Sequence, residues 1–182
     1  VTFKDVEGTR IIMIDTSIYE YLNEFNKNKT ANASEPNVKC FEHVFKRLKF
    51  KSLKDLIEHQ QQALIRFVEE AHGRHIVLVG HHPLVEIKYK SSNIISPNNA
   101  YISAVKHILR LLKGDSTLTI LCADTHNYQY SKITIDGVVI RQYVAGTGGT
   151  SVDACCKPDE KDMENGDKIS IQECTEANGY LL

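Results

Sequence analysis

Apolar and polar positions along this chain separate into short β-like runs and longer helical stretches. Runs of four to seven mostly apolar residues, bounded by turn-forming residues, predict strands. They occupy residues 9–15, 75–79, 117–123 and 168–171. A further pair of runs, 132–135 and 138–140, flanks Asp136-Gly137, a two-residue turn signal that predicts a hairpin.

Two segments carry apolar residues at helical spacing. The first follows Ser52, a residue type that caps helices, and ends before Gly73. Its apolar positions are Leu53, Leu56, Ile57, Leu64, Phe67 and Val68. The second is expected to open at Ser96-Pro97 and to stop at Gly114. Its apolar positions are Ile102, Val105, Ile108, Leu109 and Leu112.

The order of these elements predicts the fold class. Segments 26–38 and 84–95 are polar or mixed and are expected to be surface loops. The rest reads β, α, β, α, β and then a β-rich end, which predicts an α/β layered fold with parallel strands connected by helices. The length suits a single domain over residues 1–182.

Composition excludes some partners and suggests a compartment. A net charge of −1 makes nucleic acid an improbable partner. No apolar stretch reaches the roughly 20 residues that span a membrane. Five scattered cysteines without CxxC spacing favour a reduced, cytoplasmic protein. One or two disulfides, and secretion given the glycosylation sequons at Asn28 and Asn32, remain alternatives.

Chemically active side chains follow two of the predicted strands. GHHP, residues 80–83, ends strand 75–79, and Asp124 and His126 follow strand 117–123. Ligands of open α/β sheets bind at the carboxyl ends of strands, and imidazole with carboxylate suits Zn, Mn or Fe. The plainer alternatives are exposed strand-ending histidines, a turn-forming Asp124 and a surface His126.

Two other strand-end motifs are weaker candidates. Asp15-Thr16-Ser17 is better explained as a turn at the end of a strand than as a set of ligands. The glycine-rich run 146–149 is better explained as a plain turn than as a phosphate cradle, because it has no GK[ST] signature.

The ordered motifs IIMIDTS, HQQQALIRFVEE, GHHP, ADTHNYQ and AGTGG, between Thr9 and Thr150, resemble the carboxyl-terminal half of the calcineurin-like metallophosphoesterases. That superfamily includes the purple acid phosphatases. The resemblance implies a layered β-sandwich flanked by helices. The family's upstream DxH, GDxxD and GNH[DE] motifs do not occur, and the chain begins with Val1. We therefore expect the amino-terminal half of the domain to be absent from this chain, which would leave its sheet with an open apolar edge and face.

Matched by position, the resemblance makes His81 a ligand of one metal ion and His126 a ligand of the other. It makes His82 a catalytic, substrate-facing group or a support for the ligands. Asp124 stands where the family has histidine, and Ala123 where it has glycine. A carboxylate there would still bind metal, favouring Mn or Fe over Zn, or that metal site is weakened or lost.

The implied activity is hydrolysis of phosphate mono- or diesters at two divalent or trivalent ions (Mn, Fe or Zn). The substrate would be a phosphorylated small molecule or a phosphoprotein. We expect activity only when the missing amino-terminal half supplies the remaining ligands and the general acid. The alternatives are a non-catalytic binding or scaffold module of the same family, and an unrelated α/β domain with one structural zinc.

Overall fold

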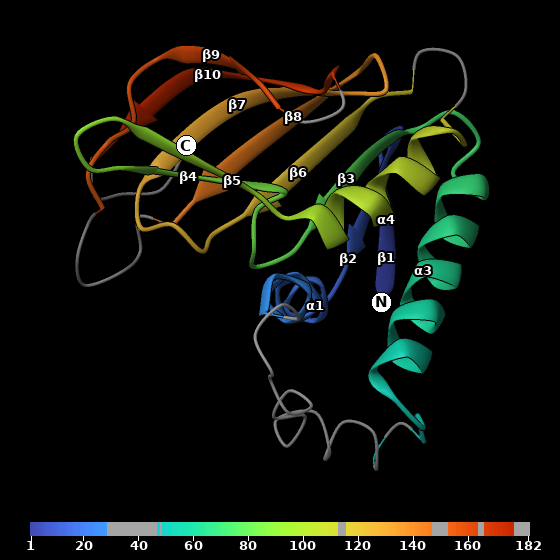
Figure 1. The fold of residues 1–182 in the computed structure, drawn as a ribbon. Helices are drawn as coiled ribbons and strands as arrows, with labels where there is room; N and C mark the ends of the chain where they lie inside the picture. Colours follow the sequence, from blue (N-terminus) through green and yellow to red (C-terminus); the bar gives the residue numbers. More distant parts are fainter. Residues whose placement is uncertain (29–46, 48, 113–115, 147–152, 164–165, 177–182) are drawn as a thin grey trace.

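The computed structural model describes residues 1–28, 47, 49–112, 116–146, 153–163 and 166–176, and Figure 1 shows their arrangement. The helices are α1 (Ser17–Asn28), α3 (Leu53–Glu69) and α4 (Asn99–Leu109). The strands are β1 (Thr2–Val6), β2 (Thr9–Met13), β3 (His75–Val79), β4 (Val85–Tyr89), β5 (Asn93–Pro97), β6 (Leu118–Cys122), β7 (Tyr128–Ile135), β8 (Val138–Ala145), β9 (Asp159–Asp162) and β10 (Lys168–Thr175).

An eight-stranded mixed sheet dominates the fold, in the order β1-β2-β3-β6-β8-β7-β10-β9. Strands β2, β3, β6 and β8 run parallel, and the other neighbours in the sheet pair antiparallel. Strands β4 and β5 form a separate antiparallel hairpin. The α/β class that the sequence predicts is therefore confirmed. The parallel strands also bring their carboxyl ends to one edge of the sheet.

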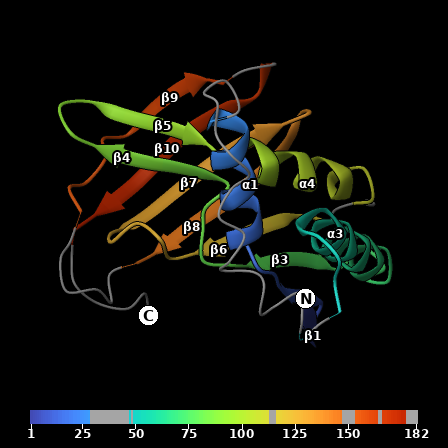
Figure 2. The same ribbon diagram turned by 60° about the horizontal axis from the view of Figure 1, so that its bottom comes forward.

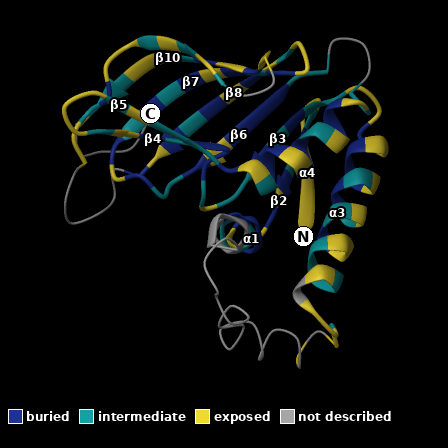
Figure 3. Ribbon diagram, viewed as in Figure 1, coloured by how far each residue is buried: buried dark blue, intermediate teal, exposed yellow. Residues whose placement is uncertain are grey.

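One face of the sheet is covered. The helices and the β4–β5 hairpin lie on the same side of it (Figures 1 and 2). Alternate strand residues are buried beneath this cover: Ile76 and Leu78 of β3 and Ile120 of β6 belong to one hydrophobic core with Ile108 of α4. Burial alternates along β2, β3 and β7, as a sheet covered on one face requires, whereas β1 is exposed throughout (Figure 3).

The opposite face and the two edges differ in character. Met13, Leu121 and Val139 are 48%, 39% and 49% exposed on the uncovered face. The two edge strands differ: β1 is wholly exposed and includes Phe3 and Val6, which are 36% and 44% exposed, whereas every residue of β9 is charged. Charged or short edge strands resist pairing with other chains. The uncovered face and the β1 edge thus both expose apolar side chains, whereas the β9 edge is charged.

Several local predictions are confirmed. The Ser52 side chain caps α3 by accepting a hydrogen bond from Asp55 N at 3.1 Å. Asp136 and Gly137 have φ of 49° and 79°, which is the backbone twist that a two-residue hairpin turn requires.

Other predictions are wrong. Segment 84–95 is largely the β4–β5 hairpin rather than a loop. The second long helix begins at Asn99, capped by the Asn98 side chain, while Ser96 and Pro97 belong to β5. Strands β1 and β9 and helix α1 were not expected, and residues 26–28 are helical rather than loop. Residues 29–38 and Gly114 lie outside the described residues.

Cys155 and Cys174 form a disulfide, which is the alternative that the sequence left open rather than the reduced state that it favoured. Cys122 and Cys156 are buried free thiols. No helix in the described part of the chain is long and apolar enough to cross a membrane.

A buried amide fixes the segment that follows GHHP, and this gives a first prediction. Gln142 of β8 accepts hydrogen bonds from Leu84 N and Val85 N, at 2.8 and 3.1 Å, and donates one to Val85 O at 2.8 Å. Gln142→Ala leaves these buried groups without partners, so we expect the free energy of unfolding to fall by about 2–4 kcal/mol. Urea unfolding measures the loss. The matched control is Gln172→Ala, at an exposed position of β10. Equal effects of the two substitutions would contradict the prediction.

Candidate metal site

Backbone hydrogen bonds join the two strand ends that carry the candidate ligands. The parallel pairing of β3 with β6 continues beyond both strands, because Gly80 N donates to Leu121 O at 3.1 Å. The His81 carbonyl then accepts from both Ala123 N and Asp124 N, at 3.0 and 3.1 Å. The GHHP and ADTH segments therefore lie side by side at the carboxyl edge of the sheet.

Three of the predicted residues meet at this edge. One potential ligand atom each from His81, His82 and Asp124 lies within 4.8 Å of the other two, and we call these residues the His-His-Asp cluster. His81 Nε2 lies 3.3 Å from Asp124 Oδ1. Ligands about 2.1 Å from a tetrahedral ion are about 3.4 Å apart, so modest side-chain rotations would let the cluster hold one ion.

The two histidines do not diverge as adjacent residues of a strand would. Their rings meet edge to face, with centroids 4.9 Å apart. The backbone there has left the strand, since β3 ends at Val79. Both imidazoles can consequently contribute to one centre.

His82 is oriented by Thr16, a residue that sequence reasoning assigned only to a turn. Thr16 Oγ1 accepts a hydrogen bond from His82 N at 2.8 Å and lies 3.2 Å from His82 Nδ1. Thr16 is buried, so this contact is sheltered from water. In the tautomer with its proton on Nδ1, the ring donates to Thr16 and leaves Nε2 free as a metal ligand.

The turn that holds Thr16 is itself fixed by side chains. Asp15 Oδ1 accepts from Ser17 N at 3.0 Å, which confirms the prediction of a strand-end turn. Gln60 of α3 brackets the same turn by accepting from Asp15 N and donating to Asp15 O, both at 3.0 Å. Helix α3 thereby positions the support of His82.

His126 lies outside the His-His-Asp cluster. Its side chain is exposed, and its backbone pairs with Asp153: His126 N donates to Asp153 Oδ2 at 2.9 Å, and His126 O accepts from Asp153 N at 3.1 Å. Its role as a ligand of a second ion stays a prediction.

The surroundings of Asp124 carry both signs of charge. Glu86, through its hydrogen bond, raises the pKa of Lys88, and the charges of Asp124 and Asp153 add to this effect. A cavity of about 80 Å³ adjoins Asp124 and is lined also by Glu20 and Glu86. Glu86 already pairs with Lys88 at 2.7 Å, so the charges of Asp124 and Glu20 are the ones that favour a further cation here.

Two glycines allow the close approach of backbone segments at the site. A Cβ on Gly146 would lie 1.7 Å from Thr125 O, so the end of β8 can pass the loop after Asp124 only with glycine there. Residues 147–149 of the glycine-rich run lie outside the described residues. A Cβ on Gly80 would lie 2.3 Å from Thr16 Cγ2 and 3.2 Å from Thr16 Oγ1.

The Gly80 contact gives a second prediction. Gly80→Ala should destabilise the protein by about 1–3 kcal/mol through overpacking, and should move Thr16 away from His82. Adding Thr16→Ser removes the clashing methyl group and keeps the hydroxyl, so Gly80→Ala/Thr16→Ser should recover much of the loss. Thermal unfolding of the two variants and of Thr16→Ser alone measures this. No recovery in the double variant would show that the clash is not with the methyl group.

The fold and the site define this chain as an α/β protein with a His-His-Asp cluster at the carboxyl ends of parallel strands. No protein-family model and no curated protein matches its sequence. One solved structure that it resembles is GAP50, described as the anchor in the inner membrane complex of Plasmodium, at 13% identity and a TM-score of 0.48. The comparison covers 98% of this chain but 43% of that one. A likeness of this degree carries no argument about function.

Proposed function

We propose that this chain is the carboxyl-terminal part of a metal-dependent phosphoesterase of the calcineurin-like type. The observation that carries the proposal is the convergence of His81, His82 and Asp124 within 4.8 Å, at the sheet edge where α/β proteins bind ligands. The His-His-Asp cluster offers two imidazoles and one carboxylate, a set that suits Mn, Fe or Zn.

Each residue has a distinct part in this proposal. His81 and Asp124 bind the metal ion, which replaces their present contact while the two ligand atoms stay close to their 3.3 Å separation. His82, held by Thr16, either completes the ligand set or faces the phosphate of the substrate. A bound ion would supply charge stabilisation for the phosphate and lower the pKa of a bound water.

The cluster alone is insufficient for a two-ion centre. His126 remains the proposed ligand of the second ion, although it lies outside the cluster. Further ligands and a general acid would come from the missing amino-terminal half of the domain. Phosphorylated small molecules and phosphoproteins remain the proposed substrates.

The uncovered face of the sheet supports the need for another layer. The pairing of β2, β3, β6 and β8 places four residues in register on that face, in one largely apolar row: Met13, Val79, Leu121 and Tyr143. Parallel strands are normally covered on both faces. The row lies close to the strand ends that carry the cluster, so a layer packed on it could also bring side chains to the metal site.

A single-ion, non-catalytic role is the second candidate. The observation that favours it is that His126 does not join the cluster, which leaves three ligands for one ion. Such a protein would keep the fold as a metal-binding or scaffold module.

Metal binding gives the third prediction. His81→Ala and Asp124→Ala should each weaken the affinity for Mn²⁺ or Zn²⁺ at least tenfold, because each removes a ligand. Isothermal titration with the metal salt measures the affinity. The matched control is His107→Ala, at an exposed position of α4 far from the strand ends in sequence, which should leave the affinity unchanged. Equal affinities for all these variants would refute the site.

Hydrolysis separates the two candidate functions and gives the fourth prediction. The chain alone should hydrolyse p-nitrophenyl phosphate poorly, whereas a longer natural polypeptide with the upstream half should hydrolyse it in a metal-dependent way, with inhibition by vanadate. His81→Ala in that longer protein should abolish the activity. Tight metal binding without hydrolysis in the longer protein would instead favour the non-catalytic role.

A further inference from the structure

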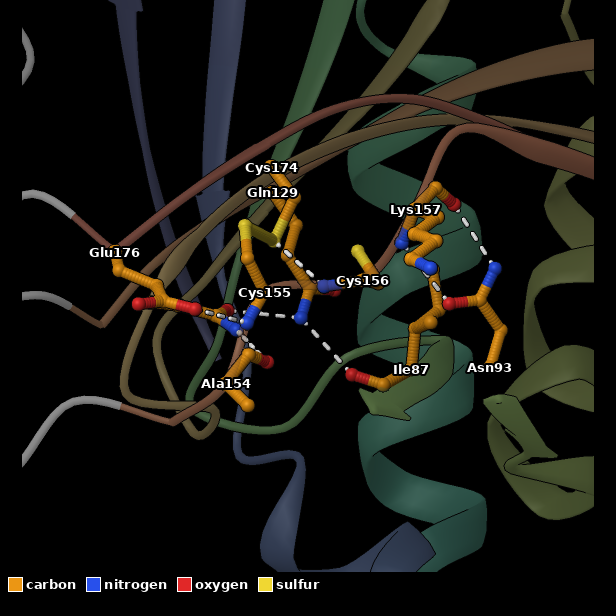
Figure 4. The surroundings of a disulfide bond; sticks show 10 residues. Ile87, Asn93, Gln129, Ala154, Cys155, Cys156, Lys157, Cys174 and Glu176 are labelled. Atoms are coloured by element: carbon orange, nitrogen blue, oxygen red, sulfur yellow. Dashed lines mark hydrogen bonds between the residues drawn. A yellow bond between two sulfur atoms is a disulfide. The ribbon is translucent and has the colours of Figure 1, made fainter. Parts of the chain in front are cut away.

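A disulfide lies in the irregular segment that precedes β9 (Figure 4). Cys155 and Cys174 form it, with their Cα atoms 5.6 Å apart. Cys155 belongs to residues 153–157, a stretch without helix or strand that we call the strap. Cys174 belongs to β10, where it pairs with Gln129 of β7. The disulfide therefore ties an irregular segment to a strand inside the large sheet.

The strap holds the metal-site loop directly. Asp153 makes two hydrogen bonds with the His126 backbone, at 2.9 and 3.1 Å. The buried Asn127 side chain donates to Ala154 O at 3.3 Å. These contacts fix residues 126 and 127, directly after Asp124 and Thr125.

Besides the disulfide, the strap is held by Cys156, which is buried in the core and whose N donates to Cys174 Sγ at 3.1 Å, and by two exposed contacts. Cys155 N donates to Glu176 Oε1 at 2.8 Å, an exposed contact that water can replace. Asn93 accepts from Lys157 N at 3.0 Å and donates to Lys157 O at 2.9 Å, and this contact is also exposed. The disulfide is the one covalent link among the contacts that the structure describes for the strap.

We propose that the Cys155–Cys174 disulfide is a reducible clamp that positions the Asp124–His126 loop. With the bond intact, Asp153 stays against His126 and fixes Asp124 beside His81. With the bond broken, the strap loosens and the loop samples more positions. The consequence for metal affinity rests on the proposed metal site, whereas the consequence for loop motion does not.

The chemistry of the switch requires an external dithiol. One dithiol molecule supplies two electrons and two protons, the Cys155–Cys174 S–S bond breaks to two thiols, and the dithiol becomes a disulfide. Both cysteines are partly exposed, so a small dithiol can reach them. The neighbouring Cys156 is buried, and burial raises the pKa of its thiol, which therefore stays protonated and does not attack the bond.

Hydrogen exchange of the metal-free protein tests the clamp. Cys155→Ser/Cys174→Ser, and the wild-type protein treated with dithiothreitol, should exchange the amides of residues 123–128 and 153–157 about tenfold faster or more than the oxidised wild type. The matched control is Gln172→Ala, at an exposed position of β10 two residues before Cys174, which keeps the disulfide and the buried Cys156. It should exchange like the wild type. Amides of β3 and β6 should stay protected in every variant, which excludes general unfolding.

Metal affinity and a conservative pair of substitutions complete the test. Co²⁺ serves as the probe, because its visible absorption reports the ligand geometry. Asp153→Ala and the double serine variant should weaken Co²⁺ binding about tenfold and shift its spectrum. Asp153→Asn should behave like the wild type, since an amide oxygen still accepts from His126 N.

The outcomes separate this inference from the proposed function. Unchanged exchange of residues 123–128 in the double serine variant overturns the clamp, whatever happens to Co²⁺ binding. Faster exchange with a tenfold loss of Co²⁺ affinity supports the clamp and the metal site together. Faster exchange in a protein whose oxidised wild type does not bind Co²⁺ supports the clamp and refutes the metal site.

Discussion

The His81 carbonyl, which accepts hydrogen bonds from both Ala123 N and Asp124 N, is the contact on which the candidate site depends. It extends the parallel pairing of β3 and β6 past the ends of both strands. Without it, the two segments that follow these strands could diverge as separate loops. Backbone pairing, rather than attraction between His81 and Asp124, therefore sets the distance between them. Gly80 permits the close approach of Thr16, which orients His82, since any Cβ there would collide with it. The site is thus a consequence of how two parallel strands end.

The two faces of the large sheet differ, because one is covered and the other exposes apolar side chains. Helices α1, α3 and α4 and the β4–β5 hairpin bury one face, and the amide of Gln142 ties the hairpin to the sheet through buried hydrogen bonds. The other face exposes Met13 and Leu121, at a cost of about 25 cal/mol for each Å² of apolar surface left in water. The same parallel strands are therefore covered on one face and open on the other, where a further layer could pack.

Local signals in the sequence predicted the elements that depend on local physics. The Ser52 cap, the strand 75–79 and the Asp136-Gly137 turn each follow from a few neighbouring residues. The β4–β5 hairpin was missed although its strand VEIKY alternates apolar and charged residues as a half-buried strand does, because residues 84–95 as a whole have a mixed composition. The residues that orient the site could not be predicted from the sequence, for another reason. Thr16 and His82 are 66 residues apart, and no periodicity signals such a pair.

A metal ion that binds at this site would have to replace the contact between His81 and Asp124. An Asp124 carboxylate that already pairs with His81 at 3.3 Å must exchange that contact for metal ligation. The His81 side chain is 64% exposed, so water stabilises it in either state and its position is weakly determined. Asp124, at 33%, is held from both sides, by the His81 carbonyl on its own backbone and by the strap through His126. Because His82 is fixed by Thr16, the geometry of the cluster is determined mainly by how firmly the Asp124 loop is held, and that loop is the part of the site nearest to the disulfide.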